Sequence, residues 1–403
     1  MEILYKGVVD LVTNDWKMIV MWLIGGILIY LAIAKKMEPT LLLPMGFGAI
    51  LVNIPSSGAI DQFIEGAEKM IPEGSALNRF AEKLPQFADV DLLASEGALS
   101  ELYYAGIANE LFPLILFIGI GAMIDFGPVL SNPKLMLFGA AAQFGIFFTL
   151  CAASMFFPEN DAASIAIIGA ADGPTAIVVA QQLQSQYLGA IMVAAYSYMA
   201  LVPVIQPPII KLCTTKKERM IRMPYAQKSV SKTTRILFPI VITIVAGLIA
   251  PASVSLVGFL MFGNLIRECG VLDSLSETAQ KVLANLVTIF LGITVATQME
   301  ADKFLSVNTL MILGLGLFAF VFDTAGGVFF AKFLNLFLKE KINPMIGAAG
   351  ISAFPMAGRI VHKMGQDEDP QNFLLMHSIG VNVSGQIASV IAGGLILAFF
   401  GGK

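Results

Sequence analysis

The sequence predicts a polytopic, all-α membrane protein, and two features of its composition carry this prediction. Of the 403 residues, 57% are hydrophobic and only 13% are charged, whereas soluble domains have about 25% charged residues. The hydrophobic residues also form long runs, such as MIVMWLIGGILIYLAIA at 18–34 and ILFPIVITIVAGLIA at 236–250. A helix needs about 20 mostly apolar residues to cross the hydrocarbon core. A buried soluble core would explain a few such runs but not most of the chain.

Changes in charge along the chain divide it into segments. The stretch 211–235 carries eight Lys or Arg residues and one acid, Glu218, and the positive-inside rule places such a loop on the cytoplasmic side. We expect N-terminal transmembrane segments, an acidic amphipathic insertion, a first transmembrane repeat, a basic cytoplasmic loop and a second transmembrane repeat, at 1–60, 61–105, 106–211, 212–235 and 236–403.

Weak internal matches suggest that the two transmembrane repeats are related. FIGIGAMIDFGPVLSNPKLMLFGA at 117–140 resembles FLGITVATQMEADKFLSVNTLMILGL at 290–315, and IGAAD at 168–172 resembles IGAAG at 346–350. The alternative is a coincidence of apolar, glycine-rich sequence. Transporter repeats are often inverted, with interrupted helices at the binding site. We therefore expect two inverted repeats with broken or re-entrant helix hairpins, arranged as a core against a scaffold, the breaks lying at 169–176 and 343–361.

The first expected break contains a charge. GAADGPTAIVVA at 169–180 places Asp172 directly before a Gly-Pro pair. A charged Asp near the bilayer centre costs at least ~2.5–3.5 kcal/mol, and carbonyls freed by a helix breaker are tolerated only where they line a cavity or meet a ligand. A Na⁺ ion bound by the carboxylate and nearby oxygens would resolve both problems, and a proton could replace it. Alternatively, Asp172 caps a helix at an exposed loop.

The second expected break offers further ligands. In NPMIGAAGISAFPMAGRIVHKMG at 343–365, Asn343 and Ser352 supply oxygens of the hard type that suits Na⁺. Arg359 supplies a planar fork for a carboxylate. The alternative is a tight helix hairpin in which Arg359 anchors the chain at the membrane face.

Polar residues in two other apolar segments are also candidates. Asn382, Ser384 and Gln386 interrupt the apolar stretch 372–394, although such side chains often only bond neighbouring helices. Tyr198, in AAYSYMALVPVIQPPI, could relay a proton or could be an interfacial anchor.

Two more acids within apolar stretches are weaker candidates for the ion site. Asp125 is followed by FGP at the end of a run, which favours an end cap, whereas Asp323 in FVFDTAGG is deeper in its run.

Common enzyme signatures are absent from the sequence. It contains no P-loop, no dinucleotide-binding glycine motif, no His-Glu-x-x-His and no Gly-x-Ser-x-Gly. The three cysteines and two histidines have no metal-binding spacing. We therefore do not expect ATP hydrolysis by this chain or nucleic acid as a partner.

Four blocks of the sequence resemble one family of membrane proteins. GAADGPTAI, AYSYMALVP, NPMIGAAGISAFPMAGRIVHK and DPQNFLLMHSIGVNVSGQIASVIAGG are similar to the β subunits of biotin-dependent, sodium-translocating decarboxylases. The resemblance runs from about residue 105 to the C-terminus, in the family's order. The acidic stretch 61–101 is longer than the family pattern, and we assign it no role.

The resemblance implies a carboxybiotin decarboxylase in the bacterial cytoplasmic (inner) membrane. Such a subunit would consume a proton while removing CO₂ from carboxybiotin and would export Na⁺. The carboxybiotin would be carried on a separate biotin carrier protein or domain, not bound covalently to this chain. The implied partners are a carboxyltransferase, the biotin carrier and a small membrane-anchoring subunit, and we expect a homo-oligomer.

The resemblance also implies roles for seven residues. The implied Na⁺ ligands are Asp172, Asn343, Ser352 and Asn382. The implied carboxybiotin-binding residues are Arg359, Asn343 and Gly347. The implied catalytic residues, which couple decarboxylation to ion passage, are Arg359, Asp172, Tyr198 and Ser352.

Two other functions would fit parts of this pattern. A stand-alone Na⁺/H⁺ antiporter or Na⁺/carboxylate transporter would share the repeats and broken helices, but a simple cation exchanger has no need for Arg359. A non-catalytic anchoring subunit would leave the polar residues within the membrane unexplained.

Overall fold

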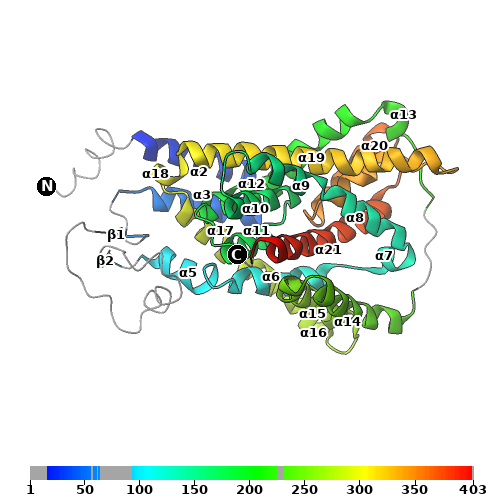
Figure 1. Cartoon of the computed structure of the whole chain (residues 1–403), viewed down its shortest axis with the longest axis horizontal. Helices are drawn as coiled ribbons and strands as arrows, with labels where there is room; N and C mark the ends of the chain where they lie inside the picture. Colours follow the sequence, from blue (N-terminus) through cyan, green and yellow to red (C-terminus); the bar gives the residue numbers. More distant parts are fainter. Residues whose placement is uncertain are drawn as a thin grey trace. The chain divides into compact units, whose positions relative to one another are not determined.

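The computed structural model describes residues 16–55, 58–60, 62–63, 93–95, 97–224 and 230–401. The only sheet in this part of the chain is formed by two short strands, β1 (Gln62–Phe63) and β2 (Leu93–Ser95). The other regular structure is helical (Figure 1). Most of the insertion expected at 61–105 lies outside the described residues, including the amphipathic pattern RFAEKLPQF.

The described residues contain seven helical stretches that are long and apolar enough to cross a membrane. An eighth results if α5 (Ala98–Gly106) and α6 (Leu111–Met123), which are bent by 64° relative to each other, form one span. The seven are α2 (Trp16–Ala34), Pro133–Ala153, α12 (Leu188–Cys213), α14 (Lys232–Ile249), Asp273–Gln298, α19 (Val307–Phe337) and α21 (Leu375–Phe400). The prediction of an all-α polytopic membrane protein is confirmed.

The remaining helices are shorter and complete or interrupt these spans. They are α3 (Pro39–Val52), α7 (Gly127–Ser131), η2 (Pro133–Leu135), α8 (Met136–Ala142), α9 (Phe144–Ala153), α10 (Glu159–Ala166), η3 (Ile167–Ala170), α11 (Gly173–Gln182), α13 (Lys216–Arg219), η4 (Pro251–Ser253), α15 (Val254–Glu268), α16 (Asp273–Thr278), η5 (Ala279–Leu283), α17 (Ala284–Val295), η6 (Ala296–Gln298), α18 (Ala301–Phe304), η7 (Pro344–Gly350) and α20 (Met356–Glu368).

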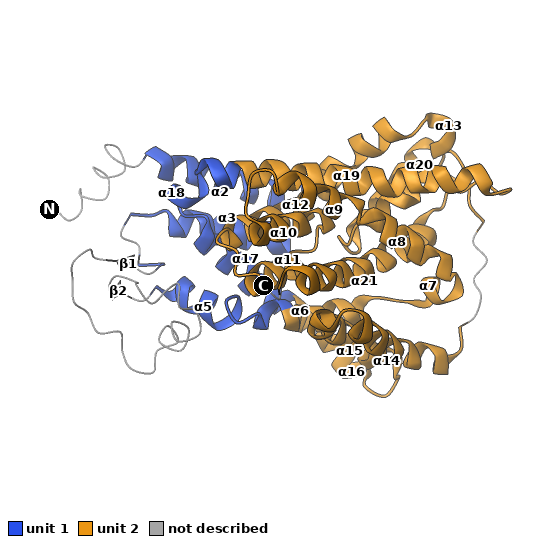
Figure 2. Ribbon diagram, in the orientation of Figure 1, with its two compact units in different colours: residues 1–113, 285–310 blue, residues 114–284, 311–403 orange. Residues whose placement is uncertain are grey.

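The chain forms two compact units (Figure 2). Unit 1 consists of residues 1–113 and 285–310, and unit 2 of residues 114–284 and 311–403. All the residues singled out above as candidate ligands or catalytic groups belong to unit 2.

Unit 1 is built on the close pair α2 and α3. A Cβ on either Gly25 or Gly46 would lie 2.7 Å from the other residue's carbonyl oxygen, so the two backbones can approach this closely only because both residues are glycines. The Asn53 side chain ties the end of α3 to a distant segment. Its Nδ2 donates to Met299 O at 2.7 Å, and its Oδ1 accepts from Ala301 N at 2.8 Å.

Unit 2 contains α21, the most buried of the seven candidate spans (Figure 1, red). Glycines let other segments lie against its backbone: a Cβ on Gly385 would be 2.0 Å from Gly350 O, and one on Gly393 would be 2.7 Å from Thr175 Cγ2. Small residues give membrane helices this kind of close approach. As a result, α21 lies against both segments that were expected to be broken.

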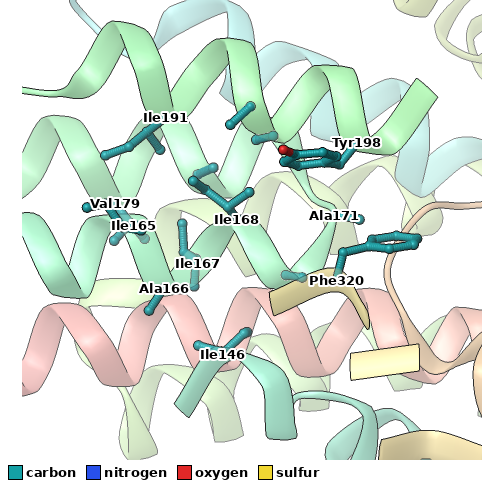
Figure 3. Close-up of a cluster of buried hydrophobic side chains, with 14 of the residues drawn as sticks. Ile146, Ile165, Ala166, Ile167, Ile168, Ala171, Val179, Ile191, Tyr198 and Phe320 are labelled. Atoms are coloured by element: carbon teal, nitrogen blue, oxygen red, sulfur yellow. The ribbon is translucent and has the colours of Figure 1, made fainter. Parts of the chain in front are cut away.

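A buried apolar cluster in unit 2 packs around η3 and its neighbours. Figure 3 shows part of it, contributed by α9, α10, η3, α11, α12 and α19, and labels Ile146, Ile165, Ala166, Ile167, Ile168, Ala171, Val179, Ile191, Tyr198 and Phe320. The cluster surrounds the segment that leads to Asp172 with side chains that cannot solvate a charge.

Candidate ion and carboxylate site

The chain changes direction immediately before Asp172. After α10, the backbone tightens into η3, and Ala171 then adopts a left-handed conformation with φ 52°. Asp172 is the N-cap of α11, whose first turn contains Pro174, and its carboxylate accepts from Thr175 N at 3.3 Å. Both a proline in the first turn and an Asp cap are favourable at a helix N-terminus. Asp172 is therefore a helix cap, but it is only 3% exposed rather than at an exposed loop.

Two side chains from α21 complete the surroundings of the Asp172 carboxylate. Its Oδ2 accepts from Gln386 Nε2 at 3.0 Å and from Ser389 Oγ at 2.8 Å. No described Lys, Arg or His forms an ion pair with it. Only neutral donors therefore contact this buried carboxylate, and a buried charge without a cationic partner is costly.

Neutral oxygens close to this site in sequence and fold also lack partners. Thr175 Oγ1, Tyr196 Oη and Asn382 Oδ1 are buried and have no hydrogen-bond partner among the described residues. Thr175 is in the turn capped by Asp172, and Asn382 is one turn before Gln386 on α21. The Tyr196 ring lies against Gly173, where a Cβ would be 2.5 Å from Tyr196 Cε1. Oxygens of this kind can ligate a cation such as Na⁺.

The second broken segment joins the first through Ser352. The helix η7 ends at Gly350, Ile351 is extended, and α20 begins at Met356. Within this break, Ser352 Oγ and Ser352 N both donate to Ala170 O, at 2.5 and 3.1 Å. Asn382 Nδ2 donates to Ile351 O at 2.7 Å. A continuous set of hydrogen bonds therefore links Ser352 and Asn382 to the segment that carries Asp172.

Asn343 makes its contacts elsewhere. Its Nδ2 donates to Arg219 O at 2.8 Å and to Ile221 O at 2.9 Å, while its Oδ1 accepts from Met345 N at 3.1 Å. In this conformation, Asn343 fastens the start of η7 to the basic loop, and none of its hydrogen bonds reaches Asp172.

Gly347 lies against α19. A Cβ on Gly347 would be 2.0 Å from Gly327 O, so this glycine allows two backbones to touch. This close backbone contact is enough to explain why position 347 is a glycine.

Arg359 and Tyr198 have different surroundings from the Asp172 site. Arg359 is exposed near the start of α20, and its side chain has no hydrogen bond or ion pair within the described part of the chain. Its guanidinium is therefore available to an anion. The Tyr198 hydroxyl donates to Leu313 O on α19 at 2.5 Å, and its ring packs against Gly316.

Ser389 and Thr175 were not predicted from the sequence, and Gln386 was predicted only as one of three polar residues that interrupt the stretch 372–394. A signal was present, because Asn382, Gln386 and Ser389 are spaced four and three residues apart and therefore share one face of a helix. Recognising that face as the partner of Asp172 required knowing which helix packs against α11.

Comparison with known proteins gives consistent matches over almost the whole chain. The protein-family model described as the β subunit of Na⁺-transporting oxaloacetate decarboxylase matches residues 17–400. The chain is 49% identical over 386 residues to the methylmalonyl-CoA decarboxylase subunit β of Propionigenium modestum, with 95% of each chain covered. It is 48% identical over 409 residues to the oxaloacetate decarboxylase β chain of Klebsiella pneumoniae, with 94% of each covered. A probable oxaloacetate decarboxylase β chain of Vibrio cholerae is 46% identical over 415 residues, with 96% of each covered.

Proposed function

The chain belongs to the family of β subunits of Na⁺-transporting decarboxylases, and from this premise we propose how its residues couple decarboxylation to Na⁺ export. It is a multi-pass membrane protein and one subunit of a multi-subunit decarboxylase. The proposed substrate is carboxybiotin on a separate carrier. Its decarboxylation breaks the bond between nitrogen and the carboxyl carbon, releases CO₂ and leaves the nitrogen to take up one proton.

In the proposal, Asp172 binds the transported Na⁺. The observation that carries it is the 3% exposed carboxylate whose hydrogen-bond partners are all neutral. Asn382 Oδ1, which is buried and unpartnered among the described residues, supplies a second ligand, and Ser352 a third through its hydroxyl. Asn343 joins the set only if it leaves the carbonyls of Arg219 and Ile221, to which it is bonded in this conformation.

A proton replaces Na⁺ at the same carboxylate in the other half of the proposed cycle. Because one proton or one Na⁺ neutralises Asp172, the site is never left as a bare buried charge, which would be costly. Ser352 links ion occupancy to the second broken segment through its bonds to Ala170 O. Tyr198, hydrogen-bonded to Leu313 O, is proposed to pass the proton or ion between this region and α19.

Arg359 is proposed to bind the carboxylate of the substrate. Its exposed guanidinium has no partner among the described residues, and a guanidinium pairs with a carboxylate through two parallel hydrogen bonds. Asn343 and Gly347 would contribute indirectly. They would fix the path of η7, and the chain continues from η7 to α20, which carries Arg359. The proton taken up by the substrate is proposed to come from the site that Na⁺ enters.

The remaining expectations complete the proposed assembly. The two transmembrane repeats at 106–211 and 236–403 are proposed to be inverted copies, and the broken segments to belong to a core that moves against a scaffold. The proposed partners are a carboxyltransferase, the biotin carrier protein or domain and a small membrane-anchoring subunit, with the β subunit forming a homo-oligomer. The proposed location is the bacterial cytoplasmic membrane.

One substitution tests the proposed ion site directly. The complex containing Asp172→Asn, reconstituted in liposomes, is given free carboxybiotin, and CO₂ release and Na⁺ transport are followed as the Na⁺ concentration is raised. We expect Na⁺-stimulated CO₂ release to disappear. Asp125→Asn is the matched control, because Asp125 caps a short turn through Gly127 N at 2.8 Å, and we expect it to behave as the wild type. Retained Na⁺ stimulation in Asp172→Asn would refute the proposal.

A further inference from the structure

A second carboxylate is buried in unit 2, at a position the proposed function does not use. Asp323 is 0% exposed and lies near the middle of α19, a helix of 31 residues. Its Oδ1 accepts from Gly145 N at 2.5 Å. Its Oδ2 is buried and has no hydrogen-bond partner among the described residues.

The Gly145 contact lies at a helix break. The span Pro133–Ala153 is interrupted at Gln143, which separates α8 from α9. The first N–H groups of α9 have no partner within the helix, and Asp323 Oδ1 accepts from one of them, that of Gly145. Capping accounts for one oxygen of the carboxylate and leaves the other unexplained.

The unpartnered oxygen faces the segment that carries Asp172. A Cβ on Gly169 would lie 2.8 Å from Asp323 Oδ2, so only a glycine leaves room for the carboxylate at that position. Gly169 is part of η3, and η3 ends directly before the left-handed residue Ala171. Any displacement of η3 therefore changes the surroundings of Asp323 Oδ2.

The same face of α19 also contacts the second broken segment. Gly327 is one turn after Asp323, and its backbone lies against Gly347. Asp323 is thus the acidic residue on a helix face that touches η3 on one side and η7 on the other.

No cationic side chain faces Asp323 from the elements packed against it. The stretches Met136–Ala153, Ile167–Ala170 and Pro344–Gly350 contain one titratable group, the thiol of Cys151, which is exposed. On α19 itself, the nearest charge is Lys332, which pairs with Glu218 at 3.1 Å. Of the two carboxylate oxygens, only Oδ2 lacks a hydrogen-bond partner among the described residues, and a proton on that oxygen removes the charge. A Na⁺ ion would instead need several further oxygen ligands around Oδ2.

We propose that Asp323 is a second proton-binding carboxyl of the pump, separate from the Na⁺ site at Asp172. In the conformation described, it carries a proton on Oδ2 while Oδ1 caps α9. A movement of η3 that carries Gly169 away from Asp323 would open Oδ2 to other groups and release that proton. The site extends the proposed function, but its protonation is measurable whether or not Asp172 binds Na⁺.

Infrared difference spectroscopy of the intact, reconstituted complex tests this assignment. A protonated carboxyl has a C=O stretching band that disappears when the group ionises. We expect the wild-type minus Asp323→Asn difference spectrum to contain this band at neutral pH, unchanged by Na⁺. The band belonging to Asp172, identified with Asp172→Asn, should disappear when Na⁺ is added. Asp125→Asn, the matched control, should leave the Asp323 band in place.

Two results would overturn the proposal. The absence of a protonated-carboxyl band for Asp323 at neutral pH would make it an ionised cap, and loss of its band on adding Na⁺ would make it a cation site. Should Asp323→Asn fail to assemble, Gly169→Ala provides the test without removing the carboxyl. The added methyl group would meet Oδ2, so the band should shift in frequency, and an unshifted band would also overturn the proposal.

Discussion

Ser352 donates two hydrogen bonds to one carbonyl oxygen, that of Ala170, and so joins the two broken segments of the chain. The hydroxyl bond is 2.5 Å long and the backbone bond is 3.1 Å long. The acceptor is two residues before Asp172, and the donor is in the break between η7 and α20. A change at either segment is therefore transmitted to the other through a direct contact.

Ser352→Ala should weaken this link without abolishing it. The backbone bond remains, so the link loses one neutral hydrogen bond, about 0.5–1.5 kcal/mol, and the hydroxyl proposed as a Na⁺ ligand is lost with it. We expect the Na⁺ concentration for half-maximal CO₂ release to rise by at least about two- to tenfold, the factor that corresponds to the hydrogen bond alone. The measurement is a Na⁺ titration of the reconstituted complex. Ser378→Ala, which removes a buried hydroxyl bonded to Leu374 O in its own helix, should leave the titration unchanged.

Ser389→Ala should also raise the Na⁺ concentration needed for half-maximal CO₂ release. Ser389 Oγ donates to the Asp172 carboxylate at 2.8 Å, and a hydrogen bond to a charged group contributes about 1.5–3 kcal/mol. We expect the half-maximal Na⁺ concentration to rise by about tenfold or more. Ser389→Thr, which restores a hydroxyl, should recover most of the affinity. Equal Na⁺ titrations for Ser389→Ala and the wild type would show that this hydroxyl does not support the ion site.

Arg359→Lys should raise the KM for free carboxybiotin while leaving Na⁺ binding unchanged. Lysine keeps the charge but lacks the planar fork, so it cannot reproduce a two-bond contact with a carboxylate. The loss of about 1.5–3 kcal/mol corresponds to a KM increase of about tenfold or more. Lys363→Ala removes another exposed charge from α20, one turn further on, and should change the KM much less. A normal KM in Arg359→Lys would exclude the fork as the binding group.

Gly347→Ala should reduce the amount of folded protein in the membrane. The new methyl group would be 2.0 Å from Gly327 O, and forcing extra atoms into a packed interface costs about 1–3 kcal/mol. Gly314→Ala is the control, because a Cβ at this position of α19 would have no atom of another described segment within 4 Å. The measurement is the midpoint temperature of thermal unfolding of each purified variant. Equal midpoints would contradict the close contact between Gly347 and Gly327.

Acid should loosen the basic loop from the α20–α21 connection. Arg222 Nε donates to Asp369 Oδ2 at 2.6 Å, and this bond lowers the pKa of the Asp369 carboxyl below its ordinary value. A carboxyl whose pKa is lowered by folding stabilises the fold above its unfolded pKa of about 3.9. That contribution is lost as the pH falls through the folded-state pKa. An acid protease active below pH 4 should therefore cut near Arg222 faster as the pH falls, and Asp369→Asn should remove most of this dependence.

The sequence was a reliable guide to the membrane-spanning class and to one charged break, because both depend on local features. Long apolar runs predict spans, and a Gly-Pro pair after Asp172 predicts a helix start whatever surrounds it. Partners distant in sequence could not be predicted in this way. Gln386 donates to Asp172 across 214 positions, and the Asn343 amide finds its acceptors in the carbonyls of a loop more than 100 residues earlier. Neither pairing leaves a local signal, since any polar residue on an apolar helix could bond to any neighbour.

The dependence of Asp172 on α21 has a consequence for how the protein is made. Chains emerge from the ribosome N-terminus first at about 5–20 residues per second, so Asp172 enters the bilayer well before Gln386 and Ser389 are synthesised. During that interval the nascent protein holds an acidic group whose two side-chain donors do not yet exist. Translation arrested before α21 should therefore yield an immature product that membrane quality-control proteases recognise and degrade.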